Sequence, residues 1–362
     1  APVAVTGDFP GQLKNIPLCR RAAGEAFADS GLELASTDRH RIGCSVSANM
    51  GDTDYVVERL QRSDLMPALK QPRWQQWLPN TACSVVANDH DLCGPRLSNS
   101  TACASGTIAF LIAVRAIRDG QCDIALTGSS QAIHPLFAAG FHNMRVLAEH
   151  PDPTQACRPF DRSRNGFVMG EGAAMFVVER LDHALARGAS IYAEVLGGHL
   201  LTDGHHVTSL NAGGEALEHL IERTLQKSGL APADIDHINA HGTGTQQNDV
   251  MEARSIRRAL GRAADAVGVT ANKSMLGHLV NASGSVELAL AALALRDGYV
   301  PPTINLRSLD PACELDCTPL VGRHRTLEHA LKLSIAFGGH LAAVALRRWP
   351  EAVARPVGLP RR

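Results

Sequence analysis

Cys103 is the residue of this chain whose surroundings most favour covalent chemistry. It stands in the stretch NSTACASGTIAF (99–110), where small and polar residues precede it and an apolar helical pattern follows. The sequence therefore places this thiol at a junction between a strand and a helix. The first turn of a helix offers unpaired backbone N–H groups and a partial positive charge, and both favour the thiolate, the nucleophilic form of cysteine. A buried structural cysteine is the alternative interpretation.

Two histidines occupy similar small-residue loops later in the chain, His241 in INAHGTGT and His278 in NKSMLGHLVNASG. An internal repeat relates the second loop to Cys103. The segments ACASGTIAFLIAVRAIRDG (102–120) and NASGSVELALAALALRDG (281–298) share Ala-Ser-Gly, a small hydroxyl residue, an apolar helix and a final Arg-Asp-Gly. In a fold with pseudo-twofold symmetry these junctions face each other, so we expect the thiol and both imidazoles to converge.

A second repeat supports the same organisation. Residues 22–51 and 221–244 each read as an amphipathic helix, Ser-Gly-Leu, an acidic linker and a β-type run. Short β-type runs alternate with helical periods along the whole chain, which indicates a layered α/β architecture. We therefore expect two related halves, residues 1–190 and 191–350, and a Pro/Arg-rich tail at 351–362.

The composition is that of an ordinary globular protein, with 45% hydrophobic and 20% charged residues in a chain of 362. The formal net charge of −1 gives no reason to expect a nucleic-acid partner. No apolar stretch reaches the roughly 18–20 residues of a membrane span and no signal sequence is present, so we expect a cytoplasmic protein. The nine scattered cysteines indicate reduced thiols, and Cys313 and Cys317 lack partners at zinc-ligand spacing, so no metal site is expected.

Six motifs in one order resemble those of the β-ketoacyl-acyl carrier protein synthases, the elongating condensing enzymes of fatty acid and polyketide synthesis. They are STACASGT, RPFDRSRNGFVMGEGAA, INAHGTGTQQND, NKSMLGHLVNASG, PPTINL and AFGGH. The resemblance runs from about residue 20 to about residue 349. It implies the thiolase fold, in which two duplicated α/β halves form five layers, αβαβα. It also implies a dimer, either of identical chains or with a related subunit.

The resemblance implies a role for each matching position. Cys103 corresponds to the cysteine that carries the acyl chain as a thioester, and His241 and His278 correspond to the two histidines of a Cys-His-His set. Lys273 and Glu287 match a charged pair that supports the second histidine. Thr208, Thr243 and Thr245 match residues that contact the pantetheine arm of the substrate. Phe337 matches a gating phenylalanine whose backbone N–H forms an oxyanion hole together with that of Cys103. His340 lies beside this gate in the sequence.

Those residue types suit a decarboxylative Claisen condensation. Exchange of an acyl group onto cysteine needs a nucleophile that is also a good leaving group. Loss of carbon dioxide from a malonyl thioester then gives an enolate without a strong base, and two neutral imidazoles can donate N–H groups to its oxygen, worth about 3–4 kcal/mol for each donor. The resemblance implies acyl- and malonyl-loaded acyl carrier protein as the partner, with no cofactor and no metal.

Two features depart from the family pattern. Members usually read Gly-Phe-Gly-Gly-Thr-Asn near the C-terminus, whereas this chain reads AFGGHL (336–341), and Ile335 stands where an aromatic residue is common. These changes favour a specialised polyketide or polyene pathway over ordinary fatty-acid elongation. The chain also starts well inside the family pattern, so we expect the first strand of the N-terminal half to be missing.

Three alternative functions fit the sequence less well. A partner subunit that sets chain length in a heterodimer typically lacks the cysteine, and degradative thiolases and initiating synthases carry Cys-His-Cys or Cys-His-Asn sets. A cysteine hydrolase has no matching sequence context here. Because carrier proteins are acidic, we also expect a basic patch at the pocket mouth, with Arg158, Arg162 and Arg164 as candidates.

Overall fold

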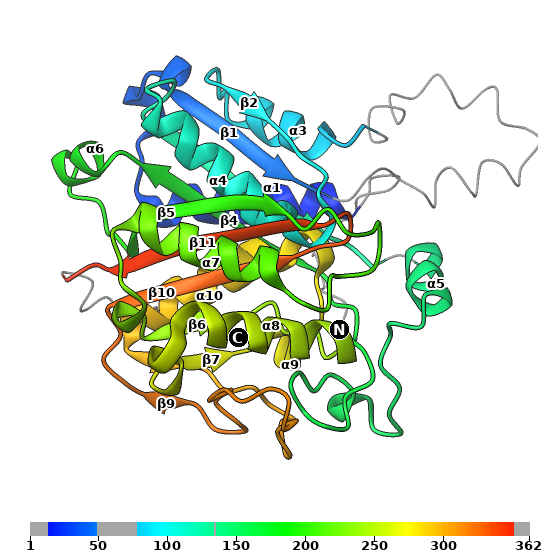
Figure 1. The fold of residues 1–362 in the computed structure, drawn as a ribbon. Coiled ribbons are helices and arrows are strands. Elements are labelled where there is room, and N and C mark those ends of the chain that lie inside the picture. Colours follow the sequence, from blue (N-terminus) through cyan, green and yellow to red (C-terminus); the bar gives the residue numbers. More distant parts are fainter. Residues whose placement is uncertain (1–13, 49–77, 134, 351–362) are drawn as a thin grey trace, which may run out of the picture.

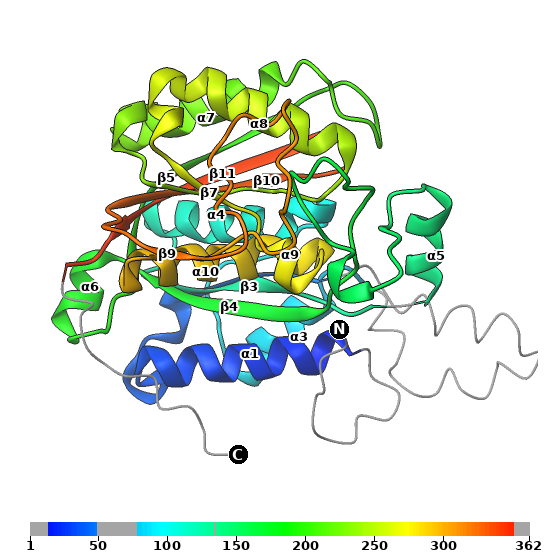
Figure 2. The ribbon, with the colours of Figure 1, turned by 90° about the horizontal axis from the view of Figure 1, so that it is seen from below.

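Five layers of secondary structure make up the protein, three of helices and two of sheets (Figure 2). The computed structural model describes residues 14–48, 78–133 and 135–350. One outer helical layer contains α1 (Asn15–Ser30) and α3 (Thr81–Asp89). The central layer contains α4 (Ser105–Arg118) and α10 (Ser283–Asp297). The opposite outer layer contains α7 (Glu215–Ser228) and α8 (Gln246–Leu260). The predicted αβαβα thiolase fold is confirmed.

The first sheet lies between the α1 layer and the central layer, with strand order β2-β1-β3-β4. Its strands are β1 (Ile42–Ser47), β2 (Arg96–Leu97), β3 (Ile124–Gln131) and β4 (Gly172–Glu179). β1 runs parallel to β2 and β3, and β4 is antiparallel to β3. Every residue of β1 and β3 is buried, as expected for strands covered by helices on both faces.

The second sheet repeats this arrangement and adds one strand, with order β5-β11-β10-β6-β7. Its strands are β5 (Ala193–Thr202), β6 (His237–Asn239), β7 (Gly268–Thr270), β10 (His329–Ile335) and β11 (His340–Arg348). β6 is parallel to β7 and β10, and β11 is antiparallel to β10, so β7-β6-β10-β11 matches β2-β1-β3-β4. The repeats seen in the sequence therefore correspond to a duplicated structural unit.

β5 is the strand without a counterpart in the first sheet. It pairs with the outer edge of β11, whereas no strand of the described residues pairs with the outer edge of β4. The expectation of a missing first strand concerns the start of the chain, which lies outside the described residues. The division of the chain at residue 190 stays a prediction, and we propose that the halves meet in the connection between β4 and β5.

The two central helices cross at their N-terminal ends with almost no space between them. A Cβ atom at Gly106 of α4 would lie 2.7 Å from the Ser285 backbone nitrogen of α10, and one at Gly284 would lie 2.6 Å from the Thr107 backbone nitrogen. Only glycine fits at both positions. This close approach brings the start of α4, where Cys103 lies, against the start of α10.

The remaining elements are short. They are α5 (Pro135–Asn143), which stands off the layered body in Figure 1, α6 (Leu181–Ala186), α9 (Lys273–Leu276), and the two-stranded ribbon of β8 (Tyr299–Val300) and β9 (Arg323–His324). No helix of the residues described here is long and apolar enough to cross a membrane.

Candidate active site

Cys103 lies in a short 3-10 turn, Ala102–Ala104, that leads directly into α4. The turn begins with a strained residue, because Ala102 has a φ of +47°, in the left-handed region that L-residues rarely adopt. An equivalent turn, Val280–Ala282, leads into α10 and begins with Val280 at a φ of +42°. The predicted pairing of the two junctions is present, and the Cys103 side chain is buried between them.

His278 comes from the second junction and contacts the thiol directly, with its Nε2 3.1 Å from the Cys103 Sγ. The Val280 backbone N–H donates to His278 Nδ1 at 3.1 Å, and the Ser283 hydroxyl lies 2.9 Å from the same nitrogen. An imidazole whose Nδ1 accepts a backbone hydrogen bond carries its proton on Nε2 when it is neutral. His278 therefore directs an N–H group at the sulfur.

His241 follows β6 and completes the set of three reactive groups. Its ring centroid lies 5.5 Å from that of His278, with the two rings nearly perpendicular. Lys273 Nζ donates to the His241 carbonyl oxygen at 2.5 Å and lies 3.4 Å from His241 Nδ1. Because the ammonium faces Nδ1, Nε2 is the nitrogen of His241 available to a substrate.

Burial lowers the pKa of both imidazoles well below the ordinary value of 6.5. The positive charge of Lys273 lowers both further, and Lys332 adds a smaller effect of the same sign. Both rings are therefore neutral at physiological pH and act as N–H donors.

Burial also raises the pKa of the Cys103 thiol, to about 11. The Lys273 charge and the backbone N–H groups of Cys103 and Phe337 oppose this effect without overcoming it. The backbone N–H at the start of α4 favours the thiolate, as expected, but desolvation outweighs it, so the net shift of the thiol pKa is upward. The same two N–H groups face the Cys103 sulfur, and the oxyanion hole that the resemblance assigns to them stays a prediction.

Lys273 and Glu287 form a buried ion pair, with Nζ 2.6 Å from Oε1. The resemblance assigns this pair to the second histidine, but the geometry places Lys273 against His241, the first. A second ammonium, that of Lys332, lies 2.8 Å from Glu287 Oε2. Sequence analysis missed Lys332; its signal is a lone charge inside the buried run HALKLSIAF (329–337), where an unpaired ammonium is costly.

Glu252 is a second group that sequence analysis missed. Both of its carboxylate oxygens accept backbone hydrogen bonds from the loop after β6, at 2.6 Å from His241 N and 2.8 Å from Gly242 N. Burial raises its pKa to about 7. It fixes the backbone that carries His241, a role that no side-chain pattern in the sequence reveals.

The residues expected to contact pantetheine lie on two loops. Thr243 and Thr245 follow His241, and their hydroxyl oxygens are 2.9 Å apart. Thr208 lies on an exposed loop that is tied to the segment after Phe337, because the Gly338 N–H donates to the Val207 carbonyl at 2.7 Å. The His340 ring packs against Gly338 at the start of β11.

Apolar side chains surround the sulfur. A buried cluster contains Cys103, Phe141, Phe167, Met169 and Val280, and the Phe167 ring meets the His278 ring edge-on at 4.9 Å. The glycine-rich segment after Phe167 packs on the His278 loop, with the Gly170 N–H donating to the His278 carbonyl at 2.9 Å. These surroundings suit an acyl chain rather than a charged substrate.

The three candidate arginines do not form one basic patch. Arg164 is fully buried, 2.7 Å from Asp310 and 3.3 Å from Asp249, so its proposed place at the surface is wrong. Its guanidinium supports the loop after β6 by donating to the Thr245 carbonyl at 3.2 Å.

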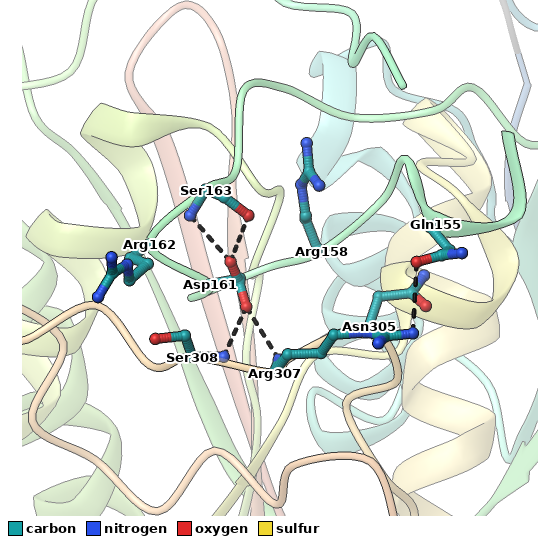
Figure 3. A pocket seen from close by; sticks show the side chains of 8 residues that line it. All are labelled: Gln155, Arg158, Asp161, Arg162, Ser163, Asn305, Arg307 and Ser308. Atoms are coloured by element: carbon teal, nitrogen blue, oxygen red, sulfur yellow. Dashed lines mark hydrogen bonds between the residues drawn. The ribbon is translucent and has the colours of Figure 1, made fainter. Parts of the chain in front are cut away.

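Arg158 and Arg162 line a separate hollow of about 160 Å³ together with Arg307 (Figure 3). The Asp161 carboxylate in this hollow accepts hydrogen bonds from Ser163, Arg307 and Ser308, as the dashed lines in the figure show. None of the predicted catalytic residues lines it.

Within the part of the chain that the structure describes, no group of three or more His, Cys, Asp or Glu side chains could hold a metal ion. Cys313 and Cys317 are free thiols packed in the core of the second half. They carry no assigned function.

Comparison with known proteins shows the family of this chain. Residues 15–184 match the beta-ketoacyl synthase N-terminal domain and residues 192–307 match the C-terminal domain of the same family. A 3-oxoacyl-[acyl-carrier-protein] synthase 2 of Mycobacterium bovis is 40% identical over 86% of this chain and 76% of its own length. The actinorhodin polyketide putative beta-ketoacyl synthase 1 of Streptomyces coelicolor is 41% identical over 90% of this chain and 72% of its own.

A solved structure shows the same fold. It is a type II polyketide ketosynthase in complex with its acyl carrier protein and bound to a hexaketide, with a TM-score of 0.90 and 32% identity over 94% of this chain and 86% of that one. The chain therefore belongs to the beta-ketoacyl synthase family and is an acyltransferase of that class.

Proposed function

We propose that the protein condenses an acyl group held on Cys103 with malonyl-acyl carrier protein, giving β-ketoacyl-acyl carrier protein and carbon dioxide. One observation carries the assignment of roles: Nε2 of His278, which bears the ring proton because Nδ1 accepts the Val280 N–H, lies 3.1 Å from the Cys103 sulfur. A nucleophile and a fixed N–H donor thus share one buried space.

In the first half-reaction the Cys103 sulfur attacks the thioester carbonyl of the acyl carrier. The carbonyl oxygen takes its negative charge between the backbone N–H groups of Cys103 and Phe337. The new C–S bond forms as the bond to pantetheine breaks, and the proton of the thiol ends on the released pantetheine sulfur. Burial raises the pKa of the Cys103 thiol to about 11, whereas the Lys273 charge and the backbone N–H groups of Cys103 and Phe337 favour the thiolate that attacks.

In the second half-reaction the malonyl carboxylate leaves as carbon dioxide, and its bonding electrons form an enolate. The Nε2–H groups of His241 and His278 donate to the enolate oxygen. The enolate carbon attacks the acyl carbonyl on Cys103, and the C–S bond breaks to leave a thiolate that takes one proton from solvent. Neutral imidazoles are required here, and both histidines have lowered pKa values.

The partner in this proposal is acyl carrier protein, with its pantetheine arm passing Thr208, Thr243 and Thr245. The ketosynthase of similar fold that was solved with its carrier protein supports this pairing. A dimer, homotypic or with a related subunit, and a cytoplasmic location stay predictions of the same proposal. A role only as a chain-length-setting partner subunit would need no nucleophile, so the assembled Cys103 site favours the catalytic role.

Intact-mass measurement with a panel of acyl-carrier thioesters tests the proposal. We expect wild type to gain one acyl group and the Cys103→Ala variant to gain none. The acyl group that loads best separates fatty acid substrates from the polyketide or polyene substrates that AFGGHL (336–341) favours. Absence of any adduct, together with absence of carbon dioxide release from malonyl-carrier, would refute the proposal.

A further inference from the structure

Lys332 is a buried ammonium that the reaction described above does not use. It lies in β10, in the middle of the second sheet, and its side chain is 0% exposed. Its neighbours along the strand, Leu331 and Leu333, are equally buried. Nζ donates to the Leu333 carbonyl oxygen and lies 2.8 Å from Glu287 Oε2, an ion-pair contact outside hydrogen-bond geometry.

Glu287 is consequently shared by two ammonium groups, because its other oxygen is bound by Lys273 at 2.6 Å. A buried ion pair is weak evidence for stability, since a well-packed apolar side chain at the same position is often as stable. A methionine would fill the space of Lys332 without any charge to desolvate. The charge at this position therefore calls for an explanation other than packing.

The contacts lead from Lys332 to the catalytic groups in three steps. Lys332 holds Oε2 of Glu287, Oε1 of Glu287 holds Lys273, and Lys273 donates to the His241 carbonyl and faces His241 Nδ1 at 3.4 Å. Without Lys332, Oε2 would have no cation beside it in the core. The Glu287 carboxylate could then turn toward Lys273 alone and draw that ammonium away from His241.

We propose that Lys332 is a positioning residue of the condensation, which acts through Glu287 to keep Lys273 against His241 and adds a positive charge to the same buried network. The inference rests on the proposed function, because it concerns the half-reaction in which the imidazoles stabilise the enolate. Lys332 touches neither Cys103 nor the site of the substrate in this arrangement.

The positive charge of Lys332 also has an effect of known direction on the two imidazoles. Among the described residues, the ionisable groups near the two imidazoles include Cys103, Lys273, Glu287, Lys332 and Glu252, with the buried Arg164–Asp249 pair behind the loop after β6. A positive charge disfavours protonation of a nearby imidazole, and removing it raises the imidazole pKa. Protonation of the imidazoles lowers the rate of carbon dioxide release at acid pH. Loss of Lys332 therefore moves this acid limb of the pH profile to higher pH, which loss of a purely structural residue would not do.

The test compares Lys332→Met with Lys227→Met, a matched control at an exposed lysine of α7. Carbon dioxide release from malonyl-carrier is followed from pH 5 to 8, and Cys103 acylation is followed by intact mass. For Lys332→Met we expect acylation to persist, kcat for carbon dioxide release to fall about tenfold, and the acid limb to move to higher pH. For Lys227→Met we expect no change in any of the three.

A second variant covers the case in which Lys332→Met does not fold. Lys332→Arg keeps a positive charge beside Glu287, so it should keep the acid limb of carbon dioxide release where it lies in wild type. An unchanged acid limb in a folded Lys332→Met, or an acid limb moved to higher pH in a folded Lys332→Arg, would overturn the inference. If wild type itself releases no carbon dioxide, the proposed function fails instead, so the two failures are distinguishable.

Discussion

The junctions at Cys103 and Asn281 share a backbone but carry different chemistry. Each is a 3-10 turn whose first residue has a positive φ, +47° at Ala102 and +42° at Val280, and each runs directly into a central helix. At the position of the thiol the second junction has Asn281, whose Oδ1 accepts a hydrogen bond from Ser105 Oγ of the first, at 3.3 Å. The strained turn therefore belongs to the duplicated fold and is not by itself a sign of catalysis.

The difference lies in what each junction contributes to the shared space between them. The first supplies a sulfur and its backbone N–H. The second supplies His278, three residues before Asn281, together with the Val280 N–H that fixes the tautomer of its ring. The same type of turn thus positions the nucleophile in one half and a hydrogen-bond donor in the other. Substitutions at each junction can therefore test the two roles separately.

Replacing the thiol should have the largest effect. Cys103→Ala is expected to lower condensation by at least about 10⁴-fold, as loss of a catalytic nucleophile does elsewhere. Carbon dioxide release from malonyl-carrier should continue, because that step uses the histidines. Intact mass and carbon dioxide release measure the two steps separately. Retention of an acyl adduct in the variant would contradict the assignment of the nucleophile.

Removing the N–H donor His278 from the second junction should have the next largest effect, and this effect should fall on the decarboxylation of the malonyl thioester. His278→Ala is expected to lower carbon dioxide release by about 10²–10³-fold, the cost of one oxyanion donor. Acylation of Cys103 should fall less, because the N–H groups of Cys103 and Phe337 still hold that oxyanion. A variant that loses acylation and keeps carbon dioxide release would reverse the roles of the two junctions.

The helix crossing beneath both junctions should respond symmetrically. Gly106→Ala and Gly284→Ala each place a methyl group 2.6–2.7 Å from a backbone nitrogen of the other helix. We expect each to lower the free energy of unfolding by about 1–3 kcal/mol, measured by urea denaturation. Gly24→Ala in α1 is the control, because nothing lies within 4 Å of its added Cβ, and it should be neutral or stabilising. A large difference between the two crossing variants would contradict the equivalence of the halves.

Most of the architecture and the three reactive groups follow from the sequence, because they depend on local features. The repeat of Ala-Ser-Gly and Arg-Asp-Gly predicts two equivalent helices, and the small-residue loops around His241 and His278 mark where chain reversals bring side chains together. The pKa of the Cys103 thiol does not follow from local sequence in this way. Burial by surrounding segments raises it to about 11, and the position of the thiol at a helix N-terminus does not predict that shift.

Groups that act through distant contacts escaped sequence analysis. Lys332 meets Glu287 across two elements 45 positions apart in the chain, and the expected basic patch failed at Arg164 because its partners Asp249 and Asp310 lie far along the sequence. A residue type reports what a side chain can do, whereas its partners depend on the tertiary fold.

Truncating Asn281 should have a small effect. Asn281→Ala removes one hydrogen bond to Ser105, which is expected to lower the free energy of unfolding by about 1 kcal/mol. Acylation of Cys103, followed by intact mass over time, should stay within about twofold of wild type, because Asn281 only braces the first junction. A loss of acylation comparable to that of Cys103→Ala would mean that the second junction shares in the nucleophilic step.

The smallest expected effect is that of mild acid, and it depends on the second junction. A free imidazole with a pKa near 6.5 is roughly three-quarters protonated at pH 6. Because burial and Lys273 hold the pKa of His241 and His278 well below 6.5, both remain neutral donors there, so carbon dioxide release from a malonyl-pantetheine thioester at pH 6 should lie within about twofold of its rate at pH 7.5. An acid limb centred near pH 6.5 would show that the imidazoles are exposed to solvent in the working enzyme, and the donor role of the second junction would then fail at neutral pH as well.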